Sequence, residues 1–191
     1  MVRPLAQTPI TPNQITALTL LLAVGGAFLF AQGDGHAANW GAGLFVVARF
    51  LDHFDGELAR LKDAKSRLGY YFDYIAGALS YTALFAGIGV GLAGGALGGW
   101  ALAIGAMGAA AAILSLFINL DIDKQMELTD GKATGYPGFA GFELEDGIYL
   151  IAPVTWLGWL TPFFVLCGIG AATYCLWSAW SLIKLRAARN D

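Results

Sequence analysis

Long apolar stretches alternate with short polar connections along the 191 residues of this chain. A helix that crosses a bilayer needs about 20 predominantly apolar residues. Six stretches fit that measure, at about 15–31, 38–61, 70–92 and 97–120, with two more sharing 147–185 on either side of Thr161-Pro162. The pattern predicts an all-α, polytopic membrane protein with six transmembrane helices, folded as a single transmembrane domain over residues 1–191.

The composition supports a membrane protein and excludes an ordinary soluble enzyme. Hydrophobic residues make up 57% of the chain and charged residues 13%, whereas soluble domains have about 45–50% and about 25%. The net charge is only −3 and the basic residues are scattered, so no nucleic-acid partner is expected. Cys167 and Cys175 are too few for a disulfide framework or a metal site and are expected to be buried thiols.

The basic residues predict the orientation, because Lys and Arg collect in cytoplasmic loops. Arg49 lies inside a predicted span, and the other ten of the eleven basic residues fall on one side of the six-helix arrangement: Arg3, Arg60, Lys62, Lys65, Arg67, Lys124, Lys132, Lys184, Arg186 and Arg189. We therefore expect a multi-pass protein of a cell inner membrane, with both termini and the active site cytoplasmic. The acidic stretch 121–146 is expected to be a solvated cytoplasmic connection.

The candidate chemistry lies where the second predicted helix leaves the membrane and the third enters it. Charged residues within spans are costly and mark functional sites. Asp52 and Asp55 share one face of a helix with the small residues Gly56 and Ala59, because positions 55, 56 and 59 all fall within about 60° of position 52. Two close carboxylates repel unless a cation lies between them, and oxygen ligands suit Mg²⁺ or Mn²⁺ holding a phosphate-bearing substrate.

Arg60 offers a guanidinium that can bind phosphate oxygens in a fork. The alternative is that the acids only pair with Arg49, Arg60 or His53 across helix turns. His53 is expected to pack or to form hydrogen bonds rather than to bind metal, since no second His lies nearby in the sequence.

The run Asp52-His-Phe-Asp55-Gly56-Glu-Leu-Ala59-Arg60, followed by Gly69 and Asp73, resembles the signature of the CDP-alcohol phosphotransferases, D-x2-D-G-x2-A-R-x8-G-x3-D-x3-D. Every spacing matches through Asp73. The segment Thr11-Pro-Asn13-Gln-Ile-Thr16 also resembles the first-helix entrance of that family. The strong resemblance covers about residues 9–80.

This resemblance implies a six-helix membrane enzyme of phospholipid-biosynthesis type, usually a homodimer surrounded by membrane lipids. Such an enzyme moves a phospho-alcohol group, here expected to be phosphatidyl, from a CDP-linked donor to an acceptor hydroxyl and releases CMP. Carried over by position, the metal ligands for Mg²⁺ or Mn²⁺ would be Asp52, Asp55 and Asp73. The residues expected to bind or shape the nucleotide pocket are Asn13, Thr16, Asp52, Gly56, Ala59, Arg60 and Gly69. The identity of the acceptor is not implied.

Gly77 departs from the family pattern, because it stands where the fourth Asp is expected. That Asp is thought to act as general base, which Gly cannot do. Three explanations stay open. In the first, another carboxylate acts as the base; Glu145 and Asp146 are the first candidates beside Asp73, and Asp121 and Asp123 come next. In the second, the protein is a weak or inactive member that binds a CDP-lipid or regulates a partner, and in the third, the substitution was introduced to disable an enzyme.

Two other functions compete with this interpretation. A polyprenyl transferase also combines Asp-rich motifs with Mg²⁺ at a membrane boundary, but Asp121-Ile-Asp123 is a poor second motif. A transporter would require paired broken helices or symmetric halves, and the sequence shows neither. The glycine-rich stretches of the third and fourth predicted helices are expected to permit close helix packing.

Overall fold

The computed structural model of the chain describes residues 2–64, 66–128 and 144–190, and the described residues form helices and connections without a strand. Side chains are described except at 127, 128, 144–146 and 188–190. The elements are α1 (Arg3–Ala6), α2 (Pro12–Ala31), α3 (Gly35–Leu61), α4 (Arg67–Leu92), α5 (Gly99–Leu128), the 3₁₀ helix η1 (Leu144–Leu150), α6 (Ile151–Trp156) and α7 (Leu160–Asn190).

Three helix starts carry side-chain caps. Thr11 and Gln14 form a reciprocal capping box at the start of α2, with Thr11 N donating to Gln14 Oε1 over 3.0 Å. Asp34 caps α3, and Ser66 caps α4 by accepting a hydrogen bond from the backbone N–H of Gly69. These caps satisfy backbone donors that have no partner within the helix. They fix the starts of the helices that carry the candidate chemistry.

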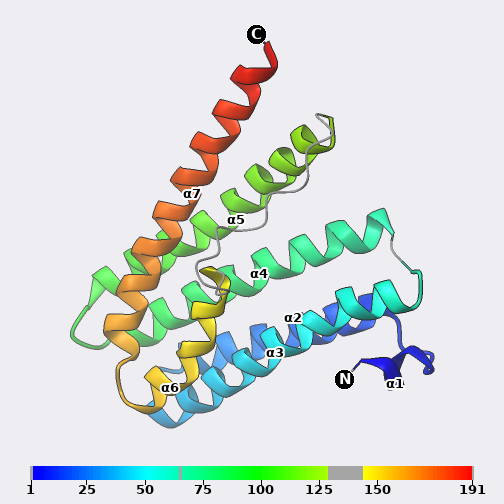
Figure 1. The fold of residues 1–191 in the computed structure, drawn as a ribbon. Helices are drawn as coiled ribbons and strands as arrows, with labels where there is room; N and C mark the ends of the chain where they lie inside the picture. The colour runs from blue at the N-terminus through cyan, green and yellow to red at the C-terminus, as the bar shows by residue number, and fades with distance from the viewer. Residues whose placement is uncertain (1, 65, 129–143, 191) are drawn as a thin grey trace.

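The long helices are neighbours in the order α3, α2, α4, α5 and α7 (Figure 1). The short α6 packs against α3 and α7 and joins the two ends of this series. A core cluster runs between the helices, with Phe45 of α3, Leu84 of α4 and Phe164 of α7 almost fully buried. A smaller cluster of Val2, Ile15 and Leu58 holds the N-terminal segment to α2 and α3.

Glycines bring the helices into backbone contact. A Cβ atom added to Gly26 of α2 would lie 2.7 Å from the carbonyl oxygen of Gly41 of α3, and the reverse distance is also 2.7 Å. On the other side of α2, a Cβ atom at Gly91 of α4 would lie 2.0 Å from the carbonyl oxygen of Phe30. The close packing expected for the third and fourth predicted helices, α4 and α5, is also found, because a Cβ atom at Gly105 of α5 would lie 2.8 Å from the carbonyl oxygen of Phe85 of α4.

Four helices are long and apolar enough to cross a membrane: Pro12–Ala31, Arg67–Leu92, Gly99–Met126 and Leu160–Ala187. The six predicted spans are therefore not all found among the described residues. The 27 residues of α3 are long enough, but its carboxyl-terminal part is too charged. The predicted fifth span corresponds to η1 and α6, where the apolar helix over Gly147–Trp156 is too short to cross.

Two predicted boundaries are wrong. The helix expected to end near Leu120 continues to Leu128, so Asp121 and Asp123 lie in α5 and not in a loop. The break expected at Thr161-Pro162 lies earlier, at Gly158, which has a φ of +77° that favours glycine. Pro162 instead stands in the first turn of α7, where a missing backbone N–H costs little. The acidic residues between 129 and 143 lie outside the described part of the chain.

Candidate metal centre

Three carboxylates from two helices meet at one point. Asp52 and Asp55 lie one turn apart near the end of α3, and Asp73 lies in the second turn of α4. One oxygen of each carboxylate lies within 4.8 Å of the others. Asp55 is buried, Asp52 is half-buried and Asp73 is exposed, so the cluster opens to its surroundings on the α4 side.

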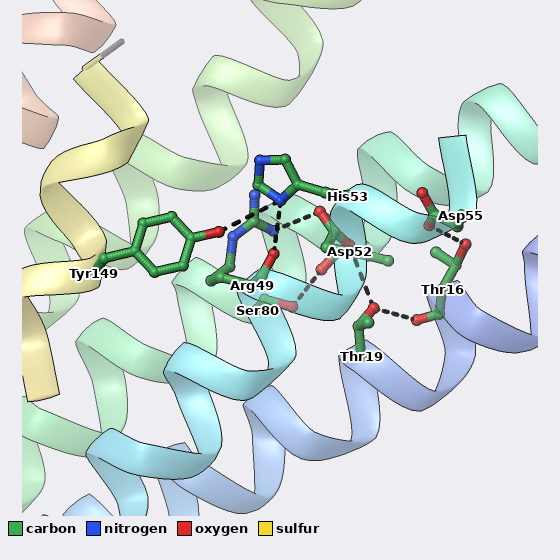
Figure 2. Close-up of polar contacts among 9 residues, drawn as sticks. Thr16, Thr19, Arg49, Asp52, His53, Asp55, Ser80 and Tyr149 are labelled. Atoms are coloured by element: carbon green, nitrogen blue, oxygen red, sulfur yellow. Dashed lines mark hydrogen bonds and ion pairs between the residues drawn. The ribbon is translucent and has the colours of Figure 1, made fainter. Parts of the chain in front are cut away.

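Hydroxyl groups of α2 hold the two aspartates of α3 in place. The Thr16 hydroxyl donates to Asp55 Oδ2 over 2.6 Å, and the Thr19 hydroxyl lies 3.3 Å from Asp52 Oδ1 (Figure 2). Both threonines are buried and face α3 because they are three residues apart on α2. The close approach of the two helices at Gly26 and Gly41 makes these short contacts possible.

Arg49 supplies a positive charge inside the cluster. Its Nη1 lies 2.9 Å from Asp52 Oδ2, and the side chains are only 11% and 17% exposed. The guanidinium also stacks over the ring of Tyr81 at 5.3 Å from the ring centroid. Asp52 thus forms the ion pair with Arg49 that the alternative interpretation expected. Asp55 and Asp73 nevertheless lie in the same carboxylate cluster as Asp52.

The electrostatics of the cluster favour a bound cation. Asp55 belongs to the charged end of α3, outside the four spanning helices. Burial raises the pKa of its carboxyl, the hydrogen bond from Thr16 lowers it, and the Asp52 carboxylate raises it again. A hard divalent cation would remove the repulsion, and three carboxylate oxygens from rigid helices are a donor set that suits Mg²⁺ or Mn²⁺.

The other expected pocket residues lie on α2, α3 and α4, the three helices that form this cluster. Gly56 is exposed, and a Cβ atom there would meet only Arg60 Nη1, at 3.9 Å, while Ala59 is partly buried in the last turn of α3. At the start of α4, a Cβ atom on Gly69 would lie 3.2 Å from Asn13 Oδ1. Asn13 and Gly69 are therefore neighbours across α2 and α4, and Arg60 extends over the open face at Gly56.

Gly77 lies one helical turn after Asp73, and a Cβ atom added to it would meet nothing within 4 Å. In the part of the chain that the structure describes, the position of this Cβ atom is therefore open space. Tyr81 follows one turn later on the same face of α4, under the guanidinium of Arg49.

Asp123 is held beside this region by two phenols. The hydroxyls of Tyr70 and Tyr74 both donate to its Oδ2, Tyr70 over 2.6 Å. Both tyrosines belong to α4, on either side of Asp73 in the sequence. Asp121, by contrast, forms an ion pair with the exposed Arg186 of α7. The sequence alone gave no signal for these contacts, which join residues 49 to 65 positions apart.

The segment η1 approaches the cluster from the other side. Its Tyr149 hydroxyl lies 3.4 Å from His53 Nδ1, and that nitrogen lies 2.9 Å from the carbonyl oxygen of Arg49 (Figure 2). His53 therefore forms hydrogen bonds, as expected. Glu145 and Asp146 belong to η1, but their side chains lie outside the part of the chain that the structure describes.

Lys62 was not expected to take part in the site. Its ammonium group donates to the carbonyl oxygens of Thr8 and Ile10, over 2.6 and 2.8 Å. This contact ties the end of α3 to the segment that precedes Thr11 and Asn13. A lysine after a helix gives no sequence signal of such a partner, because the contact spans more than 50 residues.

Comparison with known proteins extends the match beyond the motif. A family model described as CDP-alcohol phosphatidyltransferase matches residues 9–183. The CDP-diacylglycerol--glycerol-3-phosphate 3-phosphatidyltransferase of Cereibacter sphaeroides is 44% identical over 66 residues, which is 34% of this chain and 30% of that protein. The matched region is thus about a third of the length of this curated relative.

The fold resembles that of solved membrane enzymes. The phosphatidylinositol phosphate synthase of Mycobacterium tuberculosis, in complex with manganese and citrate, aligns with a TM-score of 0.62 at 20% identity and covers 95% of this chain and 86% of that one. The same synthase with CDP-DAG bound aligns with a TM-score of 0.59 at 21% identity, over 95% and 90% of the chains. At these identities the likeness concerns the fold.

Proposed function

Because this chain belongs to the CDP-alcohol phosphatidyltransferase family, we propose that it transfers a phosphatidyl-type group from a CDP-linked lipid to an acceptor hydroxyl and releases CMP. The observation that carries the proposal is the convergence of Asp52, Asp55 and Asp73 within 4.8 Å. The relative from Cereibacter sphaeroides and the CDP-DAG complex of the mycobacterial synthase support a CDP-linked lipid donor.

The three aspartates would hold Mg²⁺ or Mn²⁺, and their geometry suits either ion. When bound, the cation neutralises the donor pyrophosphate and stabilises the phosphate of the departing CMP. Thr16, Thr19 and Arg49 keep the carboxylates in position before the substrate arrives, which lowers the cost of ordering the site.

The pocket residues would hold the nucleotide beside the aspartates. Gly56 lets a large ligand approach the backbone of α3, because no side chain covers it. The exposed Arg60 can bind phosphate oxygens in a fork. Asn13 and Gly69 would form the opposite wall. Transfer then requires the acceptor oxygen to attack the donor phosphorus while the bond from that phosphorus to the CMP oxygen breaks.

The proton of the acceptor hydroxyl needs a base other than residue 77. Asp73, Glu145 and Asp146 remain the proposed catalytic carboxylates, with Asp123 as a further candidate because two phenols of α4, the helix that carries Asp73, donate to its carboxylate. Asp121 is a weaker candidate because Arg186 already pairs with it.

A direct test measures CMP released by the purified chain in detergent with Mn²⁺, CDP-linked lipid donors and pooled acceptors. Asp73→Asn and Gly77→Asp are assayed beside the native chain. We expect release by the native chain and its loss in Asp73→Asn. An absence of release from native chain and Gly77→Asp alike, with metal and donor both shown to bind, would contradict the transferase function.

The open space at Gly77 favours one alternative, a catalytically weak member that binds a CDP-lipid or regulates a partner. In that case donor and Mn²⁺ would stabilise the native chain without CMP release, whereas Gly77→Asp would release CMP. A homodimer and a cytoplasmic site at a cell inner membrane belong to the same proposal. Molecular mass in detergent and cysteine labelling from each side of the membrane test them.

A further inference from the structure

Arg49 stands out because it is a charged residue that is only 9% exposed and belongs to the apolar part of α3. It is not part of the motif that identifies the family. Burial of an unpaired charge is costly, so its partners indicate why it is there. They include the carboxylate of Asp52 and the ring of Tyr81.

The position of the guanidinium is fixed on several sides. It contacts Asp52 at 2.9 Å and lies 5.3 Å from the centroid of Tyr81. Tyr81 in turn packs edge-to-face against the fully buried Phe45, with the ring centroids 6.1 Å apart. A guanidinium held in this way keeps its positive charge within the cluster, because Arg does not lose its proton in proteins.

Arg49 also lies next to the position of the missing acid. Tyr81 is four residues after Gly77, so the two positions are stacked on one face of α4. The open space at Gly77 and the stacked guanidinium therefore belong to the same side of the cluster. An acid at position 77 would add a negative charge on the side of the cluster where the buried guanidinium of Arg49 lies.

The charge balance of the cluster follows from these contacts. Three carboxylates and one buried guanidinium leave two negative charges, which one divalent cation neutralises. A second divalent cation would meet an excess of positive charge, and the described side chains of the cluster offer it no fourth carboxylate. Asp52 already uses one oxygen for Arg49 and accepts from Thr19 with the other.

We infer that this chain binds a single divalent cation at the aspartate cluster and that Arg49 takes the place of a second cation, positioning Asp52 and completing the charge balance. The inference rests on the metal site of the proposed function and specifies its stoichiometry. It assigns to Arg49 a positioning role through Asp52.

The test counts Mn²⁺ bound to the full-length chain in detergent, using the electron paramagnetic resonance signal of free Mn²⁺ during titration. We expect one ion per native chain. Arg49→Gln removes a positive charge a few ångströms away but keeps a side-chain amide that can donate to Asp52, so it should bind a second ion, or bind the first at least about tenfold more tightly. Arg49→Lys keeps the charge and should bind one ion with an affinity close to that of the native chain.

Two Mn²⁺ ions bound per native chain would overturn the inference. Unchanged or weaker Mn²⁺ binding by Arg49→Gln would also overturn it, because that is the result expected if Arg49 only stabilises the fold. If Arg49→Gln does not fold, Gly77→Asp decides, since it adds a negative charge in open space and should bring in a second ion or tighten the first. Unchanged binding there would also overturn it. CMP release is measured separately, so one bound ion without transfer would contradict only the proposed function.

Discussion

The Thr16 hydroxyl of α2 donates to the Asp55 carboxylate of α3 over 2.6 Å, in a buried contact between residues 39 positions apart. This hydrogen bond orients the most buried member of the aspartate cluster. It also means that α2, which contributes no carboxylate, determines how the Asp55 oxygens are oriented in the cluster.

Thr16→Val removes that donor and keeps the shape of the side chain. We expect Mn²⁺ affinity to fall by about ten- to a hundredfold, the usual effect of losing a group that orients a metal ligand. Thr16→Ser is the matched control, because it retains the hydroxyl. Calorimetric titration of Mn²⁺ measures both, and equal affinities in the Val and Ser variants would show that the contact does not orient Asp55.

Asp73→Asn removes one carboxylate charge from the cluster without changing its size. We expect Mn²⁺ affinity and CMP release both to fall by at least about tenfold, since a unit charge at ligand distance is lost. Asp63→Asn is the control, because Asp63 is exposed with a φ of +50° that Asn also tolerates. If the two variants weaken binding equally, the effect comes from overall charge and not from the cluster.

Two glycines of α4 should respond oppositely to alanine. Gly77→Ala is expected to stabilise the helix by about 1 kcal/mol, because its Cβ atom enters open space. Gly91→Ala is expected to destabilise the protein by about 1–3 kcal/mol, because its Cβ atom would collide with the carbonyl oxygen of Phe30. Thermal unfolding in detergent tests both, and a destabilised Gly77→Ala would show that this space is filled.

The proton acceptor can be located among three carboxylates by comparing Asp123→Asn, Glu145→Gln and Asp146→Asn. Removing the acceptor should lower kcat by about 10²–10⁴-fold, while Mn²⁺ affinity stays near the native value. Asp121→Asn serves as the control, since Asp121 pairs with Arg186 on the exposed side of α5. Native turnover in all three variants would exclude these residues as the base.

Lys62→Met should release the N-terminal segment from α3. The ammonium group loses its hydrogen bonds to the carbonyl oxygens of Thr8 and Ile10, so cleavage by protease within residues 3–10 is expected to accelerate several-fold. Arg67→Met, which removes an exposed charge from the start of α4, is the control. Equal cleavage rates in the two variants would mean that Lys62 does not tether the segment.

Much of the site could be predicted from local spacing, because helical geometry alone brings Asp52 and Asp55 to one face. The pairing of Arg49 with Asp52 follows the same rule at a spacing of three residues. That Asp73 lies close to Asp52 and Asp55 could be predicted only from the family motif. Recognition of that family is confirmed by the match over residues 9–183.

The remaining features depend on tertiary contacts that the sequence does not display. The charged residues at the end of α5 have a sequence typical of a loop, yet they lie in a helix. Tyr70 and Tyr74 donate hydrogen bonds to Asp123, and Arg186 donates to Asp121. The contact of Tyr149 with His53 joins residues 96 positions apart. Counting apolar residues also overestimated the number of spans, since hydropathy does not show that α6 is only 6 residues long.

The backbone contacts of α2 have a mechanical consequence. Gly26 meets Gly41 on one side and Phe30 meets Gly91 on the other, so neither α3 nor α4 can slide past α2 without separating from it. The three helices therefore form one rigid unit, which carries all three aspartates together with Thr16, Thr19 and Arg49. Among the four helices that are long and apolar enough to cross a membrane, α7 is the least buried within the protein, so it has the least buried surface to lose if the helices separate.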